Sequence, residues 1–323
     1  MAWIERLAAP AFAAALMASC RPTPEPVAPA RGSDPAEAAG PAAQPELGSG
    51  TFDVEGATIT VLFDGNDPPL PPEEMEGWVL RSATMVSDYL GEFPVPSLEV
   101  TLVGRGWGGV GFGMHQDGRW VTVYCGRRTN PRSLENDWVM VHEMLHAGFP
   151  DLTRDHRWMQ EGLSTYLEPI VRARAGNTTE ESVWGRWTRS MHHGRPRSGD
   201  RGLDITHTWG RTYWGGALFW MIADIELRKQ TNNDKSLRDV VRGILREGGN
   251  GRANWSTRRV VEVADAATGT TILSELYATM AEAPGDIDLD TLYEELGVTN
   301  IDGEVFFDDD APLAHIRRAI TRP

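Results

Sequence analysis

Two histidines four residues apart, with a glutamate between them, form the part of this sequence best suited to chemistry. His142, Glu143 and His146 fit the pattern His-Glu-x-x-His and lie in an apolar run that predicts a helix. Residues four apart share one face of a helix, so both imidazoles can reach a single metal ion. Zinc accepts histidine nitrogens and, in catalytic sites, keeps one position for water, which Glu143 can deprotonate as a general base. The simpler alternative is a helix whose two histidines are ordinary hydrogen-bonded residues.

A third ligand distinguishes between these alternatives. In the metzincin pattern a glycine and a further histidine follow the second histidine, but Phe149 and Leu152 occupy those positions and exclude that class. Glu161 follows His146 after fourteen intervening residues, at the start of a second predicted helix. From there its carboxylate can complete a His-His-Glu zinc site with the opposite helix.

The two motifs together resemble those of the gluzincin metallopeptidases, in particular the aminopeptidase-N-like and glycyl-aminopeptidase-like families. Their second motif reads Glu-Gly, then an aromatic residue and often a further Glu, which here are Glu161, Gly162, Tyr166 and Glu168. The resemblance implies a thermolysin-like zincin core and one zinc ion, with three ligands: His142, His146 and Glu161. It also implies that Glu143 is the catalytic base and that Glu168 is structural.

A segment that opens a later predicted helix is similar to a third motif of these families. It reads Tyr213-Trp-Gly-Gly-Ala217. The resemblance implies that Tyr213 donates a hydrogen bond to the oxyanion of the tetrahedral intermediate, where a fixed donor helps most. His207 and Arg211 are the alternative donors in the same region.

One departure from these families concerns substrate selection. Their aminopeptidases hold the free amine of the substrate with a strand motif of the type Gly-x-Met-Glu-Asn. The nearest residues here are Phe112 to Gln116, and His115 stands where the amine-binding carboxylate should be. The resemblance therefore implies peptide-bond hydrolysis without implying exopeptidase specificity.

The first fifty residues predict export and a lipid anchor. Residues 7–18 are an apolar run of twelve, too short to span a bilayer but typical of a secretory signal. The run leads into Cys20 and resembles a bacterial lipoprotein signal, with Cys20 as the lipidated residue. We expect residues 1–19 to be a signal peptide and the Pro- and Ala-rich residues 20–50 to be a disordered tether. The expected location is the bacterial cell envelope, at the outer membrane or periplasmic face; a plain signal peptide or a buried Cys20 is the alternative.

The remaining chain changes from predicted strands to predicted helices. Alternating β-branched and aromatic residues predict strands at 58–63, 98–103 and 120–124. Apolar residues at helical spacing predict helices at 73–90, 136–147, 157–173, 180–192, 212–230, 234–247, 256–267, 270–281 and 310–320. We therefore expect an α+β fold, in which a strand-rich subdomain with a mixed sheet at 51–135 precedes a helical catalytic subdomain at 136–323.

Charge and composition narrow the range of partners. Acidic residues number 46 against 31 basic ones, and a net charge of -15 argues against nucleic acid. The segment 104–109 matches Gly-x-Gly-x-x-Gly, but a strand follows it instead of a helix; we reject a dinucleotide site and predict a loop at 104–113. Since no later apolar run could span a bilayer, we expect membrane contact through the lipid anchor only. The basic stretch 186–201 is predicted to be a solvated loop, with a wall of the cleft as the alternative.

The leading hypothesis is a lipid-anchored zinc metallopeptidase that acts on a peptide or protein substrate. A zinc-activated water would attack the peptide carbonyl, with Glu143 as general base. Two alternatives remain: a catalytically inactive, zincin-like binding lipoprotein of the cell envelope, and a zinc hydrolase that acts on a non-peptide substrate.

Overall fold

The computed structural model describes residues 50–64 and 68–322. The predicted signal peptide, the predicted lipidation site Cys20 and the predicted tether up to residue 49 lie outside the described residues. Within the two described ranges, no helix is both long and apolar enough to cross a bilayer.

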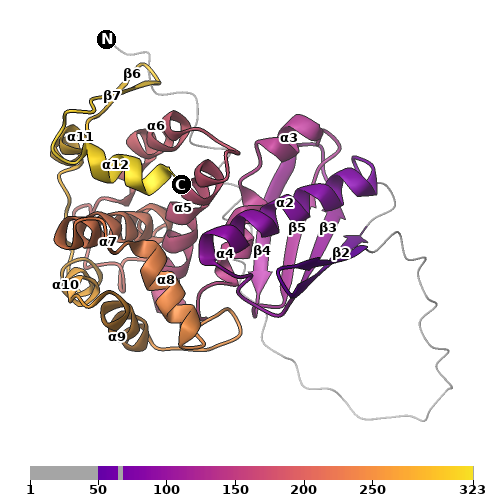
Figure 1. Ribbon diagram of the computed structural model, residues 1–323, viewed down its shortest axis with the longest axis horizontal. Coiled ribbons are helices and arrows are strands. Elements are labelled where there is room, and N and C mark those ends of the chain that lie inside the picture. The colour runs from indigo at the N-terminus through magenta and orange to yellow at the C-terminus, as the bar shows by residue number, and fades with distance from the viewer. Residues whose placement is uncertain (1–49, 65–67, 323) are drawn as a thin grey trace.

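A mixed five-stranded sheet forms the core of the N-terminal half (Figure 1). Its strands, in spatial order, are β1 (Gly50–Val54), β2 (Ala57–Asp64), β3 (Ser97–Gly104), β5 (Trp120–Cys125) and β4 (Val110–Gln116). β2, β3 and β5 are parallel to one another, whereas β1 and β4 add to the two edges in antiparallel orientation. Alternate side chains of the central strands, such as Ile59, Val100 and Val121, are fully buried. Helix α2 (Pro72–Leu90) lies across one face of the sheet (Figure 1).

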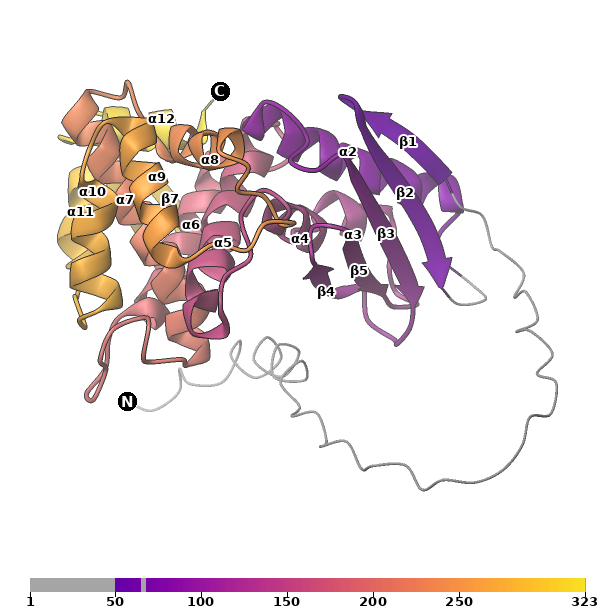
Figure 2. The same ribbon diagram turned by 90° about the horizontal axis from the view of Figure 1, so that it is seen from below.

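Helices make up most of the C-terminal half. The longer ones are α4 (Val139–His146), α5 (Arg157–Arg174), α6 (Glu180–Ser190), α7 (Gly216–Thr231), α8 (Leu237–Arg246), α9 (Thr257–Thr268), α11 (Leu289–Leu296) and α12 (Ala314–Thr321). Shorter turns are α3 (Pro131–Glu135), η1 (Arg154–His156), η2 (Met191–Gly194), the π-helical η3 (Gly210–Gly215), α10 (Ile272–Leu276) and η4 (Tyr277–Ala281). A small hairpin consists of β6 (Val298–Ile301) and β7 (Glu304–Phe307). Figure 2 shows the sheet with α2 and α3 on one side, the helices from α5 onward on the other, and α4 between them.

The α+β fold predicted from the sequence is confirmed, and each predicted strand and helix has a counterpart in the structure. The prediction of a loop at 104–113 is wrong for its last residues, because β4 begins at Val110. β4 pairs with β5 through an irregular register between Val110 and Gly113, and its glycines interrupt the alternation that identifies a strand. Strand β1, helix α11 and the β6–β7 hairpin are further elements that the sequence pattern did not predict.

Helix α5 crosses the start of α7 at two glycines. A Cβ on Gly162 of α5 would lie 2.3 Å from the carbonyl carbon of Gly216, and one on Gly216 would lie 2.1 Å from the backbone oxygen of Trp158. Real Cβ atoms do not approach other atoms this closely, so the two helix backbones are in direct contact. This crossing packs α5, and with it Glu161, against the turn η3 that carries Tyr213.

The glycine crossing predicts a large effect of one added methyl group. We expect Gly162→Ala to destabilise the protein by about 2 kcal/mol or more, because α5 and α7 would be forced apart. Gly77→Ala in α2 is the matched control, since its Cβ would meet only the flexible end of Arg81, at 3.3 Å. That variant should be neutral or up to about 1 kcal/mol more stable, because alanine favours helix. Urea denaturation measures both, and equal stability of the two variants would contradict a tight crossing.

Candidate metal centre

Helix α4 presents both histidines from a buried position. Asp137 caps its first turn: the two carboxylate oxygens accept hydrogen bonds from the backbone N–H groups of Val139 (3.0 Å) and Met140 (2.9 Å). All eight residues of the helix are buried. His142 and His146 are 5% and 9% exposed and share one face of the helix. The helix therefore places two imidazoles side by side in the interior.

The start of helix α5 is held by a single carboxylate. Oδ1 of Asp204 accepts a hydrogen bond from Nε1 of Trp158 (2.8 Å) and lies 2.9 Å from Nδ1 of His156. Its Oδ2 accepts a hydrogen bond from the hydroxyl of Tyr277 (2.5 Å). These contacts fix the first turn of α5. Glu161 follows in the next turn and is 7% exposed.

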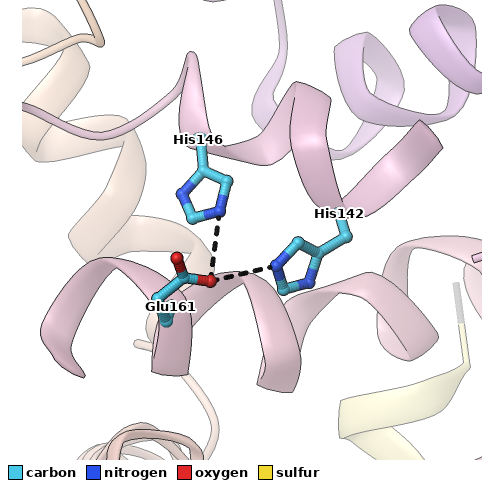
Figure 3. A group of neighbouring side chains, drawn as sticks. All are labelled: His142, His146 and Glu161. Atoms are coloured by element: carbon cyan, nitrogen blue, oxygen red, sulfur yellow. Dashed lines mark hydrogen bonds and ion pairs between the residues drawn. The ribbon is translucent and has the colours of Figure 1, made fainter. Parts of the chain in front are cut away.

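One oxygen of Glu161 faces both imidazoles (Figure 3). Its Oε2 lies 3.4 Å from Nε2 of His142 and 3.6 Å from Nε2 of His146. The candidate ligand atoms of the three residues all lie within 4.8 Å of one another. In a tetrahedral zinc site with bonds of about 2.0–2.1 Å, ligand atoms lie about 3.3–3.5 Å apart. The two distances from Oε2 and the donor types, two imidazole nitrogens and one carboxylate oxygen, therefore fit a zinc ion.

The carboxyl groups around this triad differ in their affinity for protons. Burial is the main cause that raises the pKa of Glu143 to about 7. Burial would also raise the pKa of Glu161, but His146 and His142 beside it hold that pKa well below its ordinary value. Burial lowers the pKa of His115 to about 3, and His146 adds to this shift. Glu161 is thus the ionised carboxylate of the pair, and Glu143 is the one that holds a proton more readily.

The edge strand β4 runs directly alongside Glu143. A Cβ on Gly113 would lie 2.4 Å from Cγ of Glu143, so a glycine is required for this approach. The backbone of His115 lowers the pKa of Glu143 slightly and so opposes part of the shift that burial causes. The sheet therefore orients the side chain that stands between the two histidines in the sequence.

A cavity of about 790 Å³ opens over the triad. Residues from several elements line it, among them His115 from β4, Glu143 from α4, Glu161 from α5 and Tyr213 from η3. Aromatic rings form much of the remaining wall: Phe112, Trp138, Trp209 and Trp214. The triad is thus accessible from a space large enough for part of a substrate.

Comparison with known proteins identifies the fold. No protein-family model matches the sequence, and no curated protein matches it significantly. An aminopeptidase N family protein from Idiomarina loihiensis matches with a TM-score of 0.60 at 15% identity, over 78% of this chain and 49% of that chain. An M1 zinc metallopeptidase from Deinococcus radiodurans matches with a TM-score of 0.50 at 17% identity, over 75% of this chain and 53% of that chain. The fold is zincin-like. The chain spans about half the length of these two structures.

The five predicted metal-binding and catalytic residues lie around one cavity: His142, Glu143, His146, Glu161 and Tyr213. The alternative oxyanion donors lie elsewhere. Arg211 is buried with its Nε 2.9 Å from Oδ2 of Asp200, and Nε2 of His207 lies 2.8 Å from the backbone oxygen of Asp204. Of the three candidate donors, Tyr213 alone lines the cavity.

Arg154, Arg157 and Arg186 also line the cavity. Arg186, the first residue of the basic stretch, lies over the ring of Trp138 (5.3 Å) and pairs with Glu168, so this end of the stretch is a cleft wall. Arg157 contacts Glu161 and is absent from the sequence-based prediction. The signal that could have found it is the spacing of an Arg and a Glu four residues apart on one helix.

The buried cap of α4 predicts a pH dependence of stability. Burial raises the pKa of Asp137 to about 6, against about 3.9 in an unfolded chain. Because the pKa of Asp137 is higher in the folded state, the folded protein binds this proton more tightly than the unfolded chain does. The stability that the bound proton contributes is fully present below about pH 4 and is lost as the pH rises through about 6. We expect the free energy of unfolding, relative to Asp137→Asn, to fall by about 2–3 kcal/mol between about pH 4 and pH 7. Urea denaturation of both proteins at each pH measures this difference, and a constant or rising difference would contradict the assignment.

Proposed function

We propose that this protein is a zinc-dependent metallopeptidase. The observation that carries the proposal is the position of Oε2 of Glu161, which faces Nε2 of both His142 and His146. The same cavity holds Glu143 and Tyr213, a candidate base and a candidate oxyanion donor. The zincin-like fold supports the proposal, because a solved structure with this fold is that of a zinc metallopeptidase.

The side chains suggest how a peptide bond would be cleaved. A zinc ion held by the triad would act as a Lewis acid towards water and towards the substrate carbonyl. Glu143, which packs against Gly113 of β4, accepts a proton from the attacking water and returns it to the leaving amine. The hydroxyl of Tyr213 donates a hydrogen bond to the oxyanion that develops on the carbonyl.

The cavity wall suits an extended peptide as the substrate. β4 is an edge strand that pairs with β5 on one side, and its residues line the cavity. An edge strand can pair with an extended chain through its backbone groups. The aromatic rings of the wall would then contact side chains of the substrate.

The role of Glu143 can be tested separately from metal binding. We expect Glu143→Gln to retain zinc at one ion per chain and to lose about 10²- to 10⁴-fold in turnover, since the amide cannot accept the proton. Metal content and the cleavage of a fluorogenic peptide library measure the two quantities. Glu92→Gln, in the exposed loop after α2, is the control and should keep full activity.

The outcomes separate the peptidase from the other two hypotheses. Full activity of Glu143→Gln would overturn the mechanism. Zinc bound by the wild-type protein without chelator-sensitive cleavage of any peptide would favour a non-catalytic binding protein or a hydrolase of another substrate class.

His115 leads to a prediction about whether the substrate needs a free N-terminus. An imidazole carries no negative charge in either protonation state, so His115 cannot form an ion pair with the α-ammonium group of a substrate. We expect acetylation of the substrate N-terminus to change kcat/KM by less than about tenfold. Matched pairs of free and acetylated fluorogenic peptides measure this ratio.

The variant His115→Glu supplies the matched comparison, because a carboxylate at this position should shift the preference towards the free amine. A wild-type protein that requires a free amine would refute the prediction. Such a result would point to Asp117 or Asp151, which also line the cavity.

A further inference from the structure

Arg157 contacts the oxygen of Glu161 that does not face the histidines. Its Nε and Nη2 donate hydrogen bonds of 2.9 Å and 2.8 Å to Oε1 of Glu161, one helical turn further along α5. The other oxygen, Oε2, faces His142 and His146. The two oxygens of a single carboxylate are thus divided between a guanidinium and a pair of imidazoles.

We propose that Arg157 is a positioning residue of the metal centre, which holds Oε1 of Glu161 and so leaves Oε2 as its one ligating oxygen. This inference rests on the proposed zinc site. It goes beyond that site in assigning the coordination mode of Glu161 and the residue that determines it.

The geometry favours a guanidinium for this task. Two donors of one planar group converge on one oxygen, and this fixes the rotation of the carboxylate more firmly than a single donor can. A carboxylate can bind a metal through one oxygen or two. With Oε1 engaged, Glu161 offers one oxygen, and a fourth position stays open for water. Hydrogen-bonding partners of metal ligands typically contribute about 10- to 100-fold to metal affinity.

The alternative is that Arg157 and Glu161 are merely an ion pair on a helix surface. Such pairs, four residues apart, stabilise helices only slightly. The chain contains a matched example in α9, where Nε of Arg258 lies 2.7 Å from Oε1 of Glu262. The side chain of Glu161 is 9% exposed, whereas that of Glu262 is 58% exposed. Arg258→Ala therefore controls for the loss of a helix pair away from the cavity.

The experiment compares zinc binding in full-length wild-type protein, Arg157→Ala, Arg157→Lys and Arg258→Ala. Competition with a chelator of known affinity gives the apparent zinc Kd. We expect Arg157→Ala to weaken zinc binding by about 10- to 100-fold, and Arg258→Ala to leave it unchanged. Arg157→Lys should lie between them, because an ammonium keeps the charge but cannot reproduce the planar pair of donors.

X-ray absorption of the zinc-loaded proteins supplies a second measurement. In Arg157→Ala, Oε1 of Glu161 is free to join Oε2, so the coordination number of zinc should rise above that of the wild type. Circular dichroism checks that each variant is folded, and Arg157→Lys keeps the test valid if removal of the whole side chain prevents folding.

Two different failures can be told apart. Wild-type zinc affinity and unchanged coordination in both Arg157 variants would overturn the positioning role while leaving the metallopeptidase proposal intact. A wild-type protein that binds no zinc would instead overturn the proposed metal centre itself.

Discussion

A carboxylate buried between two helices is the constraint on which the site depends. Glu161 is 7% exposed, and an ionised carboxylate without partners in such a position would cost several kcal/mol. Its partners are Arg157 on one oxygen and the imidazoles of His142 and His146 on the other. Helices α4 and α5 must therefore pack in one register, because a shift of one residue along either helix would turn the two imidazoles away from Glu161.

Contacts outside the cavity maintain that register. The carboxylate of Asp137 caps the start of α4, and that of Asp204 holds the first turn of α5. The crossing of Gly162 and Gly216 then sets the distance between α5 and α7. Each of these groups acts on a helix end or a helix crossing, so the positions of the ligands follow from the packing of whole elements.

The part of the site that the sequence predicts is the part encoded locally. His142 and His146 lie within one helix, so their spacing places both on one face, and Glu161 follows after a short connection at the start of the next helix. Strand β4 and the contact of Arg157 depend on tertiary packing. The glycines that interrupt the strand pattern of β4 in the sequence include Gly113. A glycine is required there because the strand approaches Glu143 closely. The same glycine therefore obscures the strand pattern in the sequence and allows β4 to contact Glu143.

The short connection between the two ligand helices is stabilised by a segment far along the chain. Gly251 donates a backbone hydrogen bond to the oxygen of Ala147 (2.9 Å), and Asp151 donates one to the oxygen of Ala253 (2.8 Å). Gly251 also lines the cavity, close to the ring of His115. The loop between α8 and α9 thus holds residues 147–151 and forms the cavity wall beside β4. This loop therefore holds the end of α4, the connection that follows it and the edge strand β4 close together.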